Sequence, residues 1–151
     1  MSSSGTSGAG MQAAGQSFQA TMDSSHEVPQ PNVGSSSPTG TATFNVDGQT
    51  IKYNIEAKGL TSPFTAAHIH VGDPGVAGAV VAPLMMTDGG NGTATGSGTI
   101  DASAIKGKNP DGSPMSMQDV IALLGSGKAY VNVHTQNNKP GELRGQITAA
   151  R

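Results

Sequence analysis

The stretch TATFNVDGQTIKYNIEA, residues 41–57, alternates apolar and polar side chains on both sides of a turn. Successive side chains of a β-strand point to opposite faces, so each half of this stretch predicts a strand with one apolar face. Those faces would carry Ala42, Phe44 and Val46 in the first half and Ile51, Tyr53 and Ile55 in the second. The intervening Asp47-Gly48 is a strong hairpin signal. We therefore predict an antiparallel hairpin formed by residues 41–47 and 50–57.

Similar short stretches, separated by Gly, Pro, Asn and Asp, recur along the rest of the chain. They predict strands at residues 17–22, 65–71, 78–84, 93–100, 128–135 and 142–148. Residues 88–92 are predicted as a loop and residues 137–141 as a turn. Roughly seven or eight strands with regular turn signals are typical of an antiparallel β-sandwich or barrel. The fold class is therefore expected to be all-β, with Greek-key-like connections.

One segment is expected to be helical. Ser116 stands before the apolar run of residues 120–124, and Asp119 follows it by three positions. This spacing resembles a capping box, in which the two side chains satisfy the free amide groups at a helix start. Gly125 follows the run directly and is expected to end the helix.

The composition limits the classes of function. The 151 residues indicate one domain, and contents of 34% apolar and 3% aromatic residues allow only a small core. The net charge of -2 and the lack of a Lys/Arg cluster argue against a nucleic-acid partner. No run of apolar residues is long enough to predict a membrane span. The absence of cysteine excludes disulfides and thiolate metal sites, and the charge-poor, Ser/Thr/Gly-rich composition favours an exported bacterial protein.

Residues 1–16 are a low-complexity, Ser/Gly-rich segment, which we expect to be a flexible tether before a domain at residues 17–151. Such a tether often follows the lipid-bearing cysteine of a bacterial lipoprotein. Met1 would then stand where that cysteine was, and the mature protein would carry a lipid anchor. A disordered start or a cloning scar explains the same segment equally well.

Three of the four histidines lie in two of the predicted strands. Strand alternation places His68 and His70 on one face of residues 65–71, and His134 on the polar face of residues 128–135. If the two strands are neighbours, the three imidazoles can reach one ion, with copper and zinc as the natural metals. The alternative is a set of polar side chains on a solvent-exposed face.

The fourth histidine, His26, lies in a predicted loop beside Glu27. As a fourth ligand it would close the site, which would favour a storage or structural role. If it does not bind, an open position remains for water, superoxide or peroxide. Glu27 is the best carboxylate candidate for orienting a ligand imidazole. Asn132 and Tyr130 share the face of His134 and could orient a ligand or shield the site.

Five motifs in order resemble the CHRD domain, named after chordin: EVP (27–29), AHIHVG (67–72), GAVV (78–81), YVNVHT (130–135) and PGELRGQI (140–147). The resemblance covers roughly residues 18–147. It implies a sandwich distantly like those of immunoglobulins or superoxide dismutases. Because the family is widespread in secreted bacterial proteins, it also implies an extracytoplasmic location: periplasmic, secreted or lipid-anchored.

A weaker resemblance concerns the site. Copper-zinc superoxide dismutases also carry a His-x-His strand, a later strand with a ligand His, and an arginine near the C-terminus beside the copper. His68, His70, His134 and Arg144 occur here in the same order. The bridging histidine, the zinc loop and the disulfide cysteines have no counterpart, so a dismutase-like site would hold copper only. Arg144 would guide anions to the metal. The alternative is an ion pair with Glu142, Glu27 or Asp73.

Methionines are a further possible copper contact. Met115 and Met117 have the Met-x-Met spacing of periplasmic copper-handling proteins, and Met85 stands next to Met86. Thioethers prefer Cu(I). The alternative is that these side chains fill gaps in the core.

The function that we expect from the sequence is binding of one copper ion, as Cu(I) or Cu(II), in an exported protein. The role would then be copper handling, with a trafficking or envelope protein as partner, or redox defence. If the chain is an enzyme, superoxide dismutation is the leading chemistry. Two alternatives stay open: an adhesion or protein-interaction module of the cell envelope without metal, and a redox-silent zinc domain.

Overall fold

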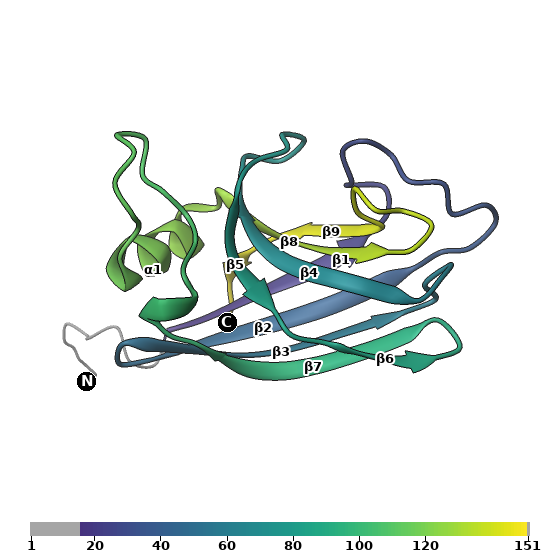
Figure 1. Ribbon diagram of the computed structural model, residues 1–151, viewed down its shortest axis with the longest axis horizontal. Coiled ribbons are helices and arrows are strands. Elements are labelled where there is room, and N and C mark those ends of the chain that lie inside the picture. The colour runs from purple at the N-terminus through teal and green to yellow at the C-terminus, as the bar shows by residue number, and fades with distance from the viewer. Residues whose placement is uncertain (1–15, 151) are drawn as a thin grey trace.

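The computed structural model describes residues 16–150, which form an antiparallel sheet with one α-helix (Figure 1). The strands are β1 (Ser17–Asp23), β2 (Thr39–Asp47), β3 (Thr50–Lys58), β4 (Phe64–Val71), β5 (Val80–Leu84), β6 (Thr87–Gly90), β7 (Thr93–Ile100), β8 (Ala129–Thr135), β9 (Leu143–Gln146) and β10 (Thr148–Ala149). The helix is α1 (Met117–Ser126), and a single 3-10 turn spans Ala102–Ala104. The tether expected at residues 1–16 lies outside the described residues except for Gln16, whose carbonyl accepts a hydrogen bond from Val46.

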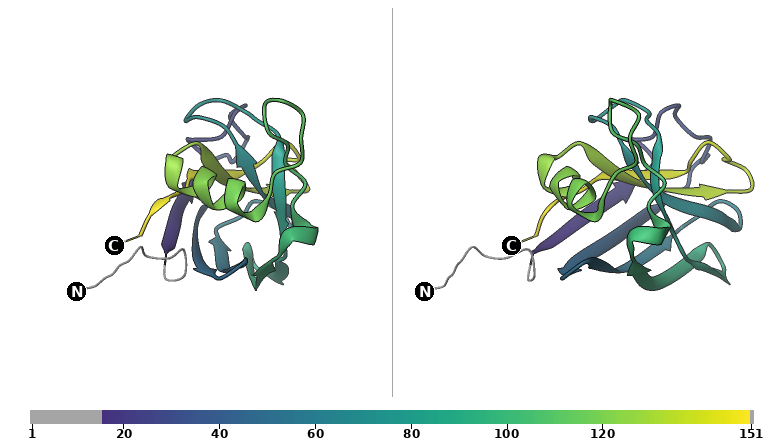
Figure 2. Two further views of the ribbon diagram at one scale, coloured as in Figure 1. Left: turned by 90° about the vertical axis from the view of Figure 1, so that its left-hand side faces the viewer. Right: turned by 60° about the vertical axis from the view of Figure 1, so that its left-hand side comes forward.

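The strands form one continuous sheet in the order β5-β4-β8-β9-β1-β2-β3-β7-β6, and β10 pairs with β1. β5 and β6 follow each other in the chain but stand at opposite ends of this order, because the sheet curls into a half-barrel (Figure 2). One half of the sheet contains β5, β4, β8 and β9, and the other contains β1, β2, β3, β7 and β6. The connections from β3 to β4 and from β7 to β8 cross from one half to the other. The expected all-β, antiparallel, Greek-key-like class with one short helix is confirmed.

The predicted hairpin is confirmed, and it forms the centre of the core. β2 pairs with β3 from Thr39–Lys58 to Asp47–Thr50, and Gly48, with φ 61°, occupies the turn. The six alternating apolar side chains of the hairpin expose at most 3% of their surface. Burying each such side chain contributes about 1.5–3 kcal/mol.

The helix begins as predicted and ends later than predicted. Ser116 and Asp119 form the reciprocal capping box, and one apolar face is buried at one end of the sheet (Figure 1). Gly125 does not end the helix. The left-handed end position is taken by Gly127, with φ 80°, because a residue without Cβ adopts that conformation at little cost.

Two further sequence predictions differ from the structure. Residues 88–92 were predicted as a loop, but Thr87–Gly90 form the edge strand β6, whose exposed side chains give no alternating pattern. The last predicted strand is divided into β9 and β10, with the buried Ile147 between them bonded to Ala129. Within residues 16–150, no helix is long and apolar enough to cross a bilayer.

Candidate metal centre

The two histidine-bearing strands are neighbours. β4 pairs with β8 in an antiparallel register that sets His68 opposite Asn132 and His70 opposite Tyr130. The residues between them, Ile69 and Val131 among others, have fully buried side chains on the core side of the sheet. Strand alternation therefore presents all the histidines of β4 and β8 on the other side.

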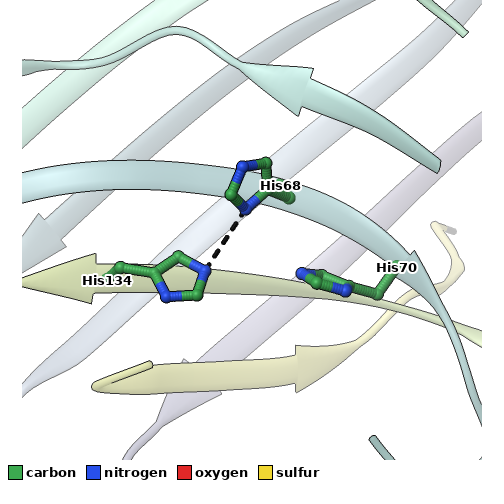
Figure 3. Close-up of side chains that lie close together, drawn as sticks. All are labelled: His68, His70 and His134. Atoms are coloured by element: carbon green, nitrogen blue, oxygen red, sulfur yellow. Dashed lines mark hydrogen bonds between the residues drawn. The ribbon is translucent and has the colours of Figure 1, made fainter. Parts of the chain in front are cut away.

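This register brings His68, His70 and His134 together (Figure 3). One ligand nitrogen from each ring lies within 4.8 Å of the other two. The closest pair is His68 Nδ1 and His134 Nε2, which are 3.2 Å apart. Two nitrogens that bind one zinc or copper ion lie at most about 4.2 Å apart. Small ring movements therefore suffice for the three side chains to hold one ion.

Two backbone carbonyls orient two of the rings. His70 Nδ1 donates to Gly78 O at 2.9 Å, and His134 Nδ1 donates to Lys139 O at 2.6 Å. A carbonyl oxygen only accepts, so Nδ1 carries the proton in both rings and Nε2 keeps its lone pair. His70 Nε2 is buried and has no hydrogen-bond partner among the described residues. Such carbonyl contacts to the far ring nitrogen are typical of metal-ligating histidines.

The environment keeps all three imidazoles neutral. Burial, followed by the neighbouring His134 and His70, lowers the pKa of His68 to about 4. Burial also lowers the pKa of His70 and of His134, although their carbonyl contacts act in the opposite direction. A histidine binds a metal in its neutral form. The cluster is therefore ready to bind at neutral pH.

A column of stacked side chains supports His70. The Tyr130 ring is nearly parallel to the His70 ring, with centroids 4.9 Å apart. On the other face of Tyr130, the Arg144 guanidinium carbon lies 3.5 Å from the ring centroid. The Tyr130 hydroxyl accepts a hydrogen bond from Gly78 N, and Gly78 O accepts the hydrogen bond from His70. The backbone of Gly78 therefore contacts both residues of the stacked pair. A Cβ on Gly78 would overlap the backbone of Val71, so only glycine fits there.

The motifs around this site agree with the comparison with known families. The family model of the CHRD domain matches residues 18–147 of the 151-residue chain. The chain belongs to the CHRD domain family. No curated protein sequence matches this CHRD domain significantly.

Arg144 of the CHRD domain is buried and forms no ion pair within the described part of the chain. Its Nη2 donates to the backbone oxygen of Asp73 at 2.9 Å and to Gln146 Oε1 at 3.2 Å. The Asp73 contact is therefore not the expected carboxylate pair. The guanidinium group stacks on the Tyr130 ring. Its role in anion guidance stays a prediction.

The structure does not bring His26 into the histidine cluster. Its Nδ1 lies 2.6 Å from the Asp23 carboxylate, and 65% of its side chain is exposed. Its role as a fourth ligand stays a prediction. Neighbouring Glu27 is buried against Gly141, and burial raises the pKa of its carboxyl to about 8. Glu27 is thus mostly protonated at neutral pH and does not accept a hydrogen bond from any of the three clustered rings.

The methionines considered as copper contacts lie in the core, at its edge or on the surface. Met117 is in the apolar core, Met115 packs next to Gly107 and Val81, and Met85 is 70% exposed. For Met115 and Met117, the structure thus agrees with gap filling.

Sequence reasoning missed two contributors, the carbonyls of Gly78 and Lys139. A backbone carbonyl has no residue-type signal. The Gly-rich segment after Val71 and the turn after His134 were the only available hints.

Proposed function

We propose that this CHRD domain binds one copper ion through His68, His70 and His134. The observation that carries the proposal is the convergence of three neutral imidazole nitrogens within 4.8 Å of one another. Imidazole suits both copper and zinc, and the Irving–Williams order favours Cu(II) over Zn(II) at equilibrium. Copper would supply one-electron redox chemistry, whereas zinc would be redox-silent.

The orientation of the rings supports this proposal. His70 and His134 each donate from Nδ1 to a carbonyl, which leaves Nε2 free to bind. His68 Nδ1 lies 3.2 Å from His134 Nε2 and donates to it in the metal-free protein, so an ion bound there would replace this hydrogen bond. An ion held there would also provide a partner for the buried His70 Nε2, which has none among the described residues.

We further propose that the domain works outside the cytoplasm, in copper handling or redox defence. The support is the charge-poor composition without cysteine, together with the extracytoplasmic location that the resemblance to the CHRD family implies. If the three histidines are the only protein ligands, a coordination position remains for a small ligand, which copper-only superoxide dismutation would need.

The test is a Cu(II) titration of the metal-free protein, monitored by EPR, with Zn(II) as competitor. We expect one saturable signal with nitrogen splitting, at one copper per chain. His70→Ala should lose most of the affinity. His26→Ala tests the predicted fourth ligand, and we expect an unchanged affinity because this exposed ring contacts Asp23.

Each result has a definite meaning. Unchanged stoichiometry in His70→Ala would refute the three-histidine site. Displacement of copper by equimolar zinc would favour the zinc domain. Absence of binding to either metal, with Cu(I) checked by chelator competition, would favour the interaction module. If copper binds, dismutase and copper-transfer assays on the loaded protein separate redox defence from copper handling.

A further inference from the structure

The histidine face contains a second buried atom that lacks a partner. Among the described residues, neither Asn132 Oδ1 nor His70 Nε2 has a hydrogen-bond partner. The two side chains are only 4% and 8% exposed, respectively. Leaving a buried acceptor unpaired costs free energy, so native proteins rarely do it without a compensating ligand, ion or water.

The register places Asn132 at the centre of this face. It stands opposite His68 on β4 and opposite Arg144 on β9. It also lies two residues before His134 on β8, so both side chains share a face. The Asn132 side chain therefore lies on the same face of the sheet as His68, His70 and His134.

We propose that the Asn132 side-chain oxygen is a fourth ligand of the metal that the three histidines hold. The inference rests on the proposed metal site. A single ion would then satisfy both unpaired atoms, His70 Nε2 and Asn132 Oδ1. No other described side chain offers an unpaired buried oxygen on β4, β8 or β9.

An oxygen ligand has a chemical consequence that a supporting residue would not have. Amide oxygens are hard donors and favour Cu(II) over the softer Cu(I), for which three imidazoles suffice. Asn132 would therefore bias the site towards Cu(II). A residue that only holds His70 in place would affect both oxidation states alike.

The experiment compares Cu(II) and Cu(I) affinities, measured by chelator competition, in the wild type and in Asn132→Ala, Asn132→Val and Asn132→Asp. Loss of an outer partner of a ligand already costs about 10–100-fold in metal affinity. We expect Asn132→Ala and Asn132→Val to lose at least tenfold in Cu(II) affinity and less than threefold in Cu(I) affinity. Asn132→Asp keeps an oxygen and should restore Cu(II) binding. Exposed Asn54→Ala is the control, and it should change neither affinity.

EPR gives an independent readout on the Cu(II) forms. The Asn132→Ala signal should keep its nitrogen splitting while its g and copper hyperfine values change. Urea unfolding of each metal-free variant tests whether that variant is folded. If Asn132→Ala does not fold, Asn132→Val replaces it, because valine is favoured in β-strands.

Two outcomes would overturn the inference. Equal losses for Cu(II) and Cu(I) would mean that Asn132 only positions His70, and unchanged affinities would mean that solvent satisfies its oxygen. Failure of the wild type to bind any metal would instead refute the proposed function, so the two failures are distinguishable.

Discussion

Replacing Arg144 with lysine keeps the positive charge but removes the planar guanidinium group. In the wild type that group lies 3.5 Å from the centroid of the Tyr130 ring, and the residue is only 2% exposed. It also donates hydrogen bonds to Asp73 O and Gln146 Oε1. Arginine and lysine are not interchangeable at a stacked site with two acceptors. We therefore expect this apparently conservative change to destabilise the fold.

The magnitude follows from the contacts. A desolvated cation–π contact contributes about 2 kcal/mol, and lysine would keep roughly half of it. A hydrogen bond from a charged group contributes about 1.5–3 kcal/mol, and a lysine would keep one of the two. The free energy of unfolding should therefore fall by roughly 2.5–4 kcal/mol. For a domain of this size, that corresponds to a Tm lower by roughly 5–16 °C.

The assay is urea and thermal unfolding of Arg144→Lys in the presence of a chelator, so that metal binding does not contribute. Lys52→Ala is the control, because its exposed ion pair with Asp47 should contribute only about 0.2–1 kcal/mol. If Arg144→Lys unfolds within about 0.5 kcal/mol of the wild type, the stabilising role of the stack on Tyr130 is refuted.

Other perturbations follow from the same structure. Because the pKa of Glu27 is raised to about 8, the folded state binds the extra proton. The free energy of unfolding should fall as the pH rises from about 5 to 8, a slope that Glu27→Gln should remove in unfolding curves across that range. Gly127→Ala should cost about 1–2 kcal/mol in urea unfolding, because φ is 80° there. Gly125→Ala, in the helix where an added Cβ would make only an ordinary contact with the Phe18 ring at 3.8 Å, should instead stabilise by about 0.5–1 kcal/mol, and equal effects of the two substitutions would contradict a helix that ends at Gly127. Cu(II) at about 100 times its Kd should stabilise the wild type by about 2.7 kcal/mol, reversibly with chelator, and thermal scans of His70→Ala should show no such gain.

Local patterns in the sequence were enough to predict most elements of the fold. The strand period of two residues set the buried faces of β2 and β3, and the Ser116–Asp119 capping box marked the helix start. These signals act between residues close in the chain, so they are legible without knowledge of the partner strands. β6 was missed for the same reason, because its side chains are exposed and only pairing with β7 makes it a strand.

The residue types of the candidate site could also be predicted, since alternation puts His68 and His70 on one face and His134 on the polar face of its strand. The motifs of the CHRD family implied that the two strands are neighbours, but the residues alone did not. The pairing of β4 with β8, about 65 residues apart in the chain, is a long-range contact that no local pattern encodes.

Only the tertiary structure decided the details on which the chemistry depends. It placed the carbonyls of Gly78 and Lys139 against two ring nitrogens and so selected the free nitrogen of each ring. It stacked Arg144 on Tyr130 rather than in the ion pair considered as the alternative to anion guidance, and it left His26 exposed beside Asp23. The physical reason is common to all of these. Hydrogen-bond partners, burial and stacking depend on which loops the curled sheet brings over its histidine face, whereas the sequence by itself determines which side chains that face can present.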